Sequence, residues 1–461
     1  MKKLQIIIML AVLTTSFLTA EGNITFSGDI QTQWGVGAPW TDSDTSAGQF
    51  LLGDTAFTGT LDAYFDKSSA LVDGSVTYNA LSKELDFSVN ELWLDYSSSF
   101  WGLRIGRQKT AWGKADGIDI TNVICPKDMS SFSAMTSDDA KLAVDAIRFS
   151  LTGNQFTADT YWIPFFRPSE LPLDEDNSLR KYIVPASVDF PVSGLPEPIT
   201  VPVAIGSLEK PETAIWNGEY GLKISGYFPA LDLSLYGFYG WDDLPLLDYT
   251  ISYSAPTETM PYALLNAISV GGEYKRMGMI GVDAAIPIKA TVLRTEAAFF
   301  PQRYFQKSSE KIMEEKMTAA AKAAQTGKAS AAVETSEQHN ELSALIGLDW
   351  MPSGWTITAQ YFCDFVFGDL DALERKDAYT HGSTLSLSKS LVNETLELSL
   401  SGLLNFNDFD SLISPSVSYS LSDQINLSAG AYIFLPGPNE EGKYGQYKDL
   451  SSIYIKAKFS F

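Results

Sequence analysis

The chain has 461 residues, of which 45% are hydrophobic and 12% aromatic, and its formal net charge is −23. Such an acidic composition argues against a nucleic-acid partner, because attachment to a phosphate backbone needs an excess of Lys and Arg. The apolar residues lie in short alternating segments, and beyond the N-terminal region no run reaches the roughly eighteen residues that predict a membrane-spanning helix.

Residues 1–20 have the layout of a secretory signal peptide. Lys2 and Lys3 precede an apolar run from Leu4 to Leu18, which is short for a spanning helix. The sequence therefore predicts export and cleavage after Ala20, with residues 21–461 as one domain. An exported chain with short alternating apolar segments is either a large secreted β protein or an outer-membrane barrel.

Alternation of apolar and polar residues with a period of two predicts about 18 strands. They lie near residues 23–35, 54–66, 70–78, 86–96, 101–109, 141–151, 155–162, 217–227, 231–241, 268–277, 289–300, 341–349, 355–365, 384–390, 395–403, 413–421, 425–435 and 453–461. Short and long connections alternate, as in a barrel whose short turns face the periplasm. The predicted fold is all-β: a closed antiparallel up-and-down transmembrane β-barrel with one helical insertion in an extracellular loop.

The last strand ends in Phe461, with Phe459 two residues before it. This ending resembles the signal by which the bacterial barrel-assembly machinery recognises its substrates. We therefore expect Phe461 to contact that machinery, and the outward apolar face of the barrel to contact outer-membrane lipid.

Three long connections are expected at the outer mouth of the barrel. Residues 110–140 are polar and interrupted by glycines, and we expect them to fold inward as a constriction loop. Residues 163–216 hold many prolines, which exclude a long helix and favour an extended lid or plug. Residues 302–340 are rich in Ala, Glu and Lys, which favours a protruding helix near 309–324 with little surface to bury.

The parity of each strand identifies candidates for the pore lining. Charged residues of the wall should face the interior, since Arg or Lys on the lipid side costs roughly 2–4 kcal/mol at the bilayer midplane. The candidates on strands are Arg104, Gln108, Arg148, Lys223, Arg294 and Glu296, and those on the constriction loop are Asp116, Asp119, Lys127 and Asp128.

Two interpretations of these charges stay open. Arg294 and Glu296 share one face of a strand, and opposed basic and acidic side chains can orient a charged solute in a constriction. The same residues can instead form ion pairs that tie a loop to the wall. For the loop itself, the alternative is that it packs on the barrel rim without narrowing the pore.

The segment from Gly106 to Asp128 resembles a signature of the alginate-export-like outer-membrane porins. The shared residues are Gly106-Arg107-Gln108, Trp112-Gly113, Asp116-Gly117, Ile120-Thr121 and Cys125-Pro126-Lys127-Asp128. Cys125 stands where that family usually has Asn. The resemblance implies an eighteen-stranded substrate-conducting porin, and it does not imply that alginate is the solute.

The sequence favours a monomeric channel for passive diffusion of small polar or charged solutes. The inward positions mix basic and acidic residues, whereas export of a polyanion calls for a mainly basic lumen. The alternative is a plugged barrel that acts as a surface adhesin or antigen through its long loops, and a barrel for hydrophobic solutes ranks third. No enzymatic activity is expected, because His339 and His381 lack a catalytic serine context, and no metal-ligand spacing or phosphate-binding loop predicts a cofactor.

Overall fold

The computed structural model describes residues 22–38, 46–131, 140–174, 177, 179–190, 198–253, 265–326, 332–438 and 442–461, and the structural statements below concern these residues. The predicted signal peptide, residues 1–20, lies outside them. In this part of the chain, no helix is both long and apolar enough to cross a membrane.

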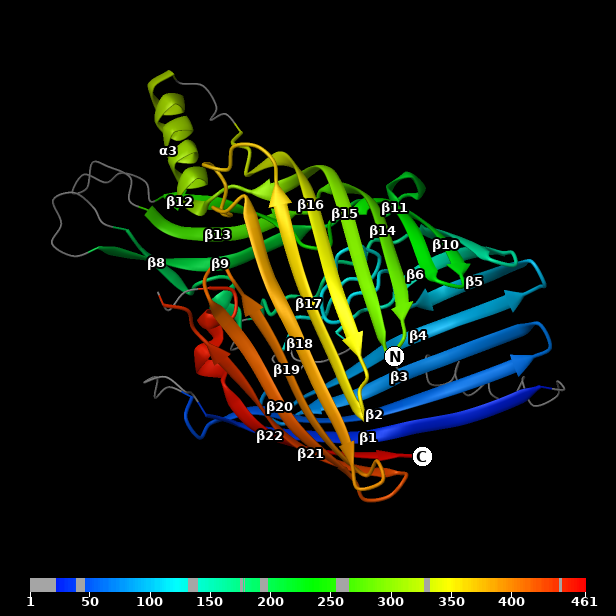
Figure 1. Ribbon diagram of the computed structural model, residues 1–461. Helices are drawn as coiled ribbons and strands as arrows, with labels where there is room; N and C mark the ends of the chain where they lie inside the picture. Colours follow the sequence, from blue (N-terminus) through cyan, green and yellow to red (C-terminus); the bar gives the residue numbers. More distant parts are fainter. Residues whose placement is uncertain are drawn as a thin grey trace, which may run out of the picture.

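Eighteen strands form one sheet that closes on itself (Figure 1). Neighbouring strands pair antiparallel, and β1 pairs with both β2 and β22, which closes the ring. The wall strands are β1 (Asn23–Gly37), β2 (Phe50–Phe65), β3 (Ser68–Asn79), β4 (Glu84–Ser97), β5 (Trp101–Gln108), β6 (Val144–Thr152), β7 (Phe156–Ile163), β10 (Glu219–Phe228), β11 (Leu231–Trp241), β14 (Arg276–Ile288), β15 (Thr291–Gln306), β16 (Ser336–Trp350), β17 (Trp355–Val366), β18 (Tyr379–Leu391), β19 (Leu396–Asn405), β20 (Asp410–Ser420), β21 (Ile425–Leu435) and β22 (Ser452–Ser460). The predicted closed antiparallel barrel is confirmed.

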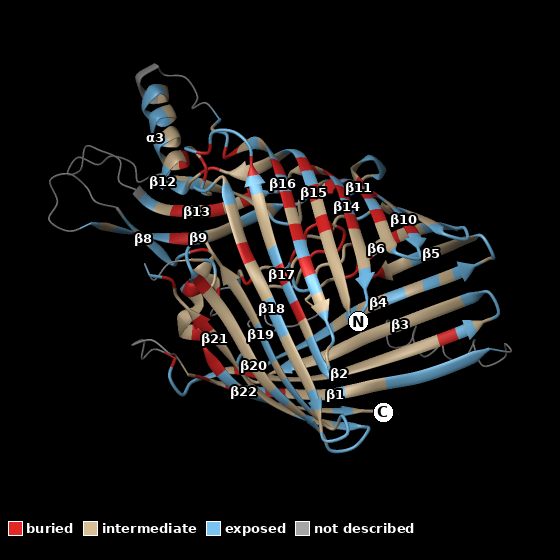
Figure 2. Ribbon diagram, viewed as in Figure 1, coloured by how far each residue is buried: buried red, intermediate tan, exposed pale blue. Residues whose placement is uncertain are grey.

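The two faces of the wall follow from the alternation of side chains along each strand. Large apolar residues point outward, and Leu94, Ile280 and Ile455 are 63%, 67% and 63% exposed. Their neighbours in sequence, such as Asp95 and Lys456, point inward. Figure 2 shows the result as alternating buried and exposed positions along strands such as β14 and β16.

The connections differ in length between the two ends of the barrel. At one end, which we call the short-turn end, Asp66 and Lys289 adopt the left-handed conformation within connections of a few residues. At the other end, the long-loop end, lie the described parts of the longer connections: 109–131, 140–143, 164–174, 179–190, 198–218, 242–253, 265–275, 307–326 and 332–335. Phe461 follows β22 and extends its pairing with β1, because it exchanges two backbone hydrogen bonds of 3.0 Å with Gly28.

One wall strand differs from its prediction. The prediction of a wall strand at 268–277 is wrong, because β13 (Leu265–Glu273) belongs to a second sheet and the wall strand that follows it is β14. Met277 and Met279 on the inner face of β14 are as apolar as Ile280 and Val282 on its outer face. The alternation of apolar and polar residues is therefore absent from β14. The turn between β13 and β14 is not apparent from the sequence either.

The second sheet lies at the long-loop end, with the strand order β12-β13-β9-β8 (Figure 1). Strands β8 (Ser187–Phe190) and β9 (Ile199–Glu209) come from the Pro-rich connection, whereas β12 (Leu246–Tyr253) and β13 come from the connection between β11 and β14. β9 and β13 pair in parallel, and Val203 and Ile268 share a small buried core between them. The Pro-rich connection thus supplies half of a sheet and, in its described part, no long helix.

Helix α3 (Ser309–Thr326) lies where the composition predicts one. However, Ile312 is fully buried, Met313 packs against the core of the second sheet, and Lys316 Nζ lies 2.7 Å from Asp248 Oδ1. The expectation of a helix with little surface to bury is therefore wrong for its first turns. The average composition of the segment does not reveal that Ile312 and Met313 attach the helix to the second sheet.

Candidate constriction site inside the barrel

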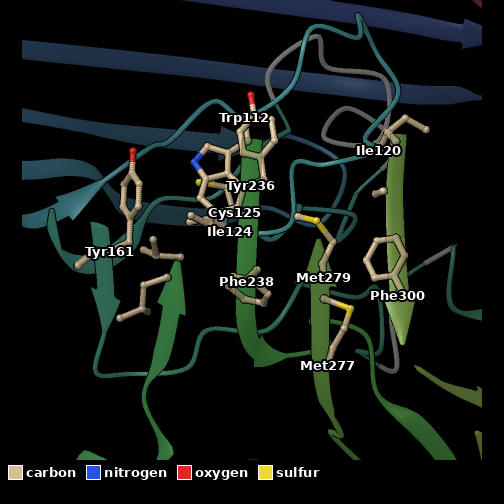
Figure 3. Packing of buried hydrophobic residues seen from close by; sticks show 14 of the residues in the cluster. Trp112, Ile120, Ile124, Cys125, Tyr161, Tyr236, Phe238, Met277, Met279 and Phe300 are labelled. Atoms are coloured by element: carbon tan, nitrogen blue, oxygen red, sulfur yellow. The ribbon is translucent and has the colours of Figure 1, made fainter. Parts of the chain in front are cut away.

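The connection between β5 and β6 folds into the barrel in its first described part, residues 109–131. Its residues Trp112, Ile120 and Ile124 are buried in one cluster with inward-facing residues of β6, β7, β11, β14, β15 and β16. Figure 3 shows this cluster, with the loop residues lying against Tyr161, Tyr236, Met279 and Phe300. The prediction that this segment turns inward agrees with these contacts.

Aromatic packing fixes the first part of the loop. The Trp112 ring centroid lies 5.0 Å from that of Tyr236 and 5.8 Å from that of Tyr161. Two glycines of the wall make room for the loop: a Cβ on Gly221 would lie 3.1 Å from the Trp112 ring, and one on Gly281 would lie 2.6 Å from Thr121. The wall is therefore shaped to receive the loop.

A buried carboxylate fastens the loop to β15. Glu296 is 3% exposed, and its two oxygens accept hydrogen bonds from the backbone N–H groups of Lys114 (2.7 Å), Ala115 (3.1 Å) and Thr121 (2.7 Å) and from the Thr121 hydroxyl (2.7 Å). Gly113 has φ +83°, and a Cβ there would lie 2.4 Å from the carboxylate. Such charge-assisted hydrogen bonds are the stronger kind, so this carboxylate is the main polar anchor of the loop.

The tip of the loop reaches further round the wall. The Arg294 guanidinium donates to the Lys114 carbonyl (2.5 Å), to Asp116 (2.6 Å) and to Asp349 on β16. The Gln360 side chain on β17 donates to the Asp116 carbonyl (2.8 Å) and accepts from its N–H (3.0 Å). The Asp116 side chain is 63% exposed, so its carboxylate faces the open part of the interior.

The base of the loop is held by a second group of charges. Lys127 Nζ lies 2.5 Å and Lys141 Nζ 3.6 Å from the Asp119 carboxylate, which also accepts a hydrogen bond of 2.8 Å from Asn122. Burial raises the pKa of Asp119, but Lys127, Asn122 and Lys141 together outweigh it and hold this pKa below its usual value. Asp128 accepts hydrogen bonds from the Ser130 N–H and hydroxyl, which stabilises the turn that follows.

The remaining candidates lie on the wall beside the loop. Arg104 Nε is 2.9 Å and an Arg148 nitrogen 3.6 Å from the same oxygen of Asp95, and the Arg104 guanidinium stacks 3.8 Å from the Trp93 ring centroid. The Lys223 ammonium lies 5.5 Å from the Tyr236 ring centroid. The structure thus joins Arg104 with Arg148, whereas Arg294 belongs to the separate group at the loop tip.

Two predicted pore-lining residues do not line open space. Gln108 is fully buried and donates to the carbonyls of Ala146 (3.0 Å) and Gly106 (3.3 Å). Glu296 is enclosed by the loop that it anchors. Both residues have the inward parity that led to the prediction, but parity does not show which inward positions the loop covers.

Sequence reasoning missed several wall residues that hold the loop. Tyr236 accepts from the Gly113 N–H (3.1 Å) and donates to Asp283, and Gln360 binds the loop tip directly. Asp349 accepts from Arg294, which in turn binds the loop tip. These residues have inward parity on their strands. A systematic search for polar inward residues near the middle of strands would have included them, but nothing local connects them with the loop.

The connection after β7 joins the loop to the opposite side of the mouth. In this bridging segment, residues 164–190, the Glu170 N–H donates to the Lys127 carbonyl (2.9 Å) and the Asn177 amide to the Ser130 carbonyl (2.6 Å). Leu179 is buried against residues of β2, β21 and the 3-10 helix η3 (Gly445–Leu450), and the Tyr182 ring lies 4.9 Å from that of Tyr447. The described residues of this segment therefore contact both the constriction loop and the far side of the wall, and the lid at 163–216 stays a prediction.

Solved outer-membrane proteins with similar folds have little sequence in common with this chain. DcaP of Acinetobacter baumannii, an outer membrane channel, is 9% identical with a TM-score of 0.43, and the alignment covers 95% of this chain and 97% of DcaP. OccAB3 of the same organism is 8% identical with a TM-score of 0.49, covering 95% and 99%. OccK9 (OpdG) of Pseudomonas aeruginosa is 7% identical with a TM-score of 0.48, covering 95% and 98%.

The match to a family model is the stronger result. No curated protein matches the chain. The resemblance to the alginate-export-like porins remains a prediction. The model described as "Protein of unknown function (DUF1302)" matches residues 77–421, well over half of the sequence, and the chain therefore belongs to the DUF1302 family.

Proposed function

We propose that this protein is a monomeric outer-membrane porin for passive diffusion of small polar or charged solutes, narrowed by the loop at 110–140. The observation that carries the proposal is the inward fold of this loop, which is bound to Glu296 and Gln360, far along the chain. A closed wall with apolar side chains outside and polar side chains inside suits a barrel that spans lipid and encloses water.

The charges near the loop support a selective constriction. Asp116 presents an exposed carboxylate beside Arg294 and Asp349, and Arg104 and Arg148 present two guanidinium groups that share one carboxylate. The first cluster, one Arg with two Asp, has an excess of negative charge, and the second, two Arg with one Asp, has an excess of positive charge. Two clusters of opposite net charge would create a field across the path of a solute. Arg294, whose side chain is 12% exposed, ties the loop to the wall, and Asp116 is the member of this pair whose carboxylate would meet a solute.

Conductance of the purified chain in planar lipid bilayers tests the proposal. We expect discrete channel openings, and Asp116→Cys should lose conductance when a charged methanethiosulfonate reagent is added, because the modified side chain then occupies the opening. The matched control is Asp423→Cys, which places the same group in an exposed connection at the short-turn end. Absence of conductance at every voltage, or equal block of both variants, would contradict a pore narrowed at Asp116.

A second candidate is a plugged barrel that acts as a surface adhesin or antigen. The observation that favours it is the bridging segment, whose residues Leu179 and Tyr182 pack against the far side of the mouth. The same bilayer recordings separate the two candidates. A plugged barrel predicts no conductance in the wild type and its appearance after Leu179→Ser, which weakens the apolar contact.

A further inference from the structure

A pocket of about 360 Å³ lies at the long-loop rim, apart from the constriction. Its basic lining residues are Lys275, Arg276, Arg303 and Arg375, and its apolar lining includes Leu244, Leu246 and Phe305. Four basic residues around one pocket are notable in a chain with a net charge of −23. The volume of the pocket is larger than a simple inorganic ion needs and falls within the range of volumes of small-molecule sites.

The pocket takes residues from both faces of the wall. Arg276 pairs with Trp241 across β14 and β11 on the outward face, while its neighbour Met277 is buried inside. Arg303 lies near the long-loop end of β15 and donates a hydrogen bond to Glu341, whose position on β16 faces the interior. The pocket therefore lies where the outward surface and the mouth of the barrel meet.

Among the described residues Arg276 forms no ion pair, whereas Arg375 lies 3.5 Å from Glu341 and Lys275 lies 2.6 Å from Glu273. Arg303 is neutralised by Asp242 and Glu341, both at 2.8 Å. In contrast, Arg276 donates to the backbone carbonyls of Gly218 (2.9 Å) and Trp216 (3.4 Å), and its guanidinium lies 4.1 Å from the Trp241 ring centroid. Lys275 lies 5.4 Å from the Tyr304 ring centroid, and its ion pair with Glu273 is made to a half-exposed carboxylate that solvent screens.

We propose that this rim pocket binds an organic anion in which one carboxylate or phosphate group is joined to an apolar body. The acid group lies against Lys275 and Arg276, whose aromatic contacts hold the two cations in place. The apolar body lies against Leu244, Leu246 and Phe305. Such an anion has two sources: a free organic acid that approaches the mouth, or a lipid of the surrounding leaflet whose phosphate sits at the rim.

Calorimetric titration of the full chain in an uncharged detergent, with octanoate as the probe, tests the proposal. We expect saturable binding that weakens at least tenfold in the double variant Lys275→Gln and Arg276→Gln. Arg276→Lys, which keeps the charge, should bind within a few fold of the wild type. The matched control is Lys389→Gln, because Lys389 also lies over an aromatic ring, 4.9 Å from Trp355, but at the short-turn end and outside this pocket.

The outcomes are distinct from those of the channel experiment. None of these variants lies in the constriction, so their conductance should equal that of the wild type. Failure of octanoate to bind the wild type, or equal binding by the double variant, would overturn the rim site and leave the channel proposal intact. A repeat in nanodiscs with and without phosphatidylglycerol identifies the source: competition by this lipid assigns the pocket to a lipid phosphate, and undiminished octanoate binding assigns it to free organic acids.

Discussion

The substitution Glu296→Gln should release the constriction loop. Each carboxylate oxygen accepts two hydrogen bonds from the loop, and an amide group replaces one acceptor oxygen with a donor. Two bonds to a charged group are then lost, each contributing about 1.5–3 kcal/mol, so that the closed loop loses about 3–6 kcal/mol relative to the open one. Since 1.4 kcal/mol is a factor of ten, the open population should rise by about 10² to 10⁴ fold.

Cys125 reports this opening. Cys125 belongs to the loop, and its thiol is buried between the loop and the wall, where it accepts a hydrogen bond from the Thr110 N–H (3.2 Å). Burial raises the pKa of this thiol to about 11, so the closed loop holds it unreactive. In a Cys363→Ser background, alkylation of Cys125 by N-ethylmaleimide should follow the open population. We expect the rate to increase by at least a hundredfold in Glu296→Gln, together with a larger conductance.

Glu397→Gln is the control for this experiment. Glu397 is an inward carboxylate on β19 that accepts from Ser399 (3.3 Å), and among the described residues it has no hydrogen bond or ion pair with the loop. Its substitution changes the charge of the interior by the same amount and should leave Cys125 unreactive. Equal alkylation rates in the two variants would refute the argument that Glu296 anchors the loop.

Three further predictions concern the loop and the wall. Gly113→Ala should speed alkylation of the loop thiol more than Gly117→Ala, because both glycines have positive φ but only Gly113 lies against the anchoring carboxylate, whereas nothing lies within 4 Å of a Cβ at Gly117. Ile455→Lys should lower the free energy of unfolding from lipid vesicles by about 2–4 kcal/mol, whereas Ser418→Lys on an inward position should change it much less; equal losses in urea titrations would contradict the orientation of the wall. The depressed pKa of Asp119 stabilises the loop above the usual carboxyl pKa of about 3.9, and this contribution is lost as the pH falls through the lower folded-state pKa. The conductance difference between the wild type and Asp119→Asn should therefore be constant above about pH 4 and disappear at more acidic pH, and a difference that persists there would contradict this role.

The wall was predictable wherever its inner face is polar. On β20, Ser416 and Ser418 alternate with Val417 and Tyr419, so period two identifies the strand and both of its faces. On β14 the inner methionines pack under the loop, and both faces are apolar. Polar and apolar side chains alternate only where one face of the strand meets water and the other meets lipid. This alternation cannot identify a strand whose inner face packs against protein.

The site was predictable as a set of residues but not as a set of pairs. Asp116 and Arg294 were both expected in the interior, and they meet at 2.6 Å across a separation of 178 positions. Local periodicity shows that a residue faces inward, but it carries no information about which strand a loop tip reaches. The parallel pairing of β13 with β9 was missed for the same reason, since the two strands come from different connections.

The apolar stripe inside the barrel has a practical consequence for engineering. Excision of the loop to obtain a wider passage would leave Tyr236, Phe238, Met279 and Phe300 wetted along one side of the tube. The pore of a truncated chain would be wider, but its wall would expose an apolar surface that retains apolar solutes. Any redesign toward larger cargo must therefore replace these wall residues with hydrophilic ones in the same step.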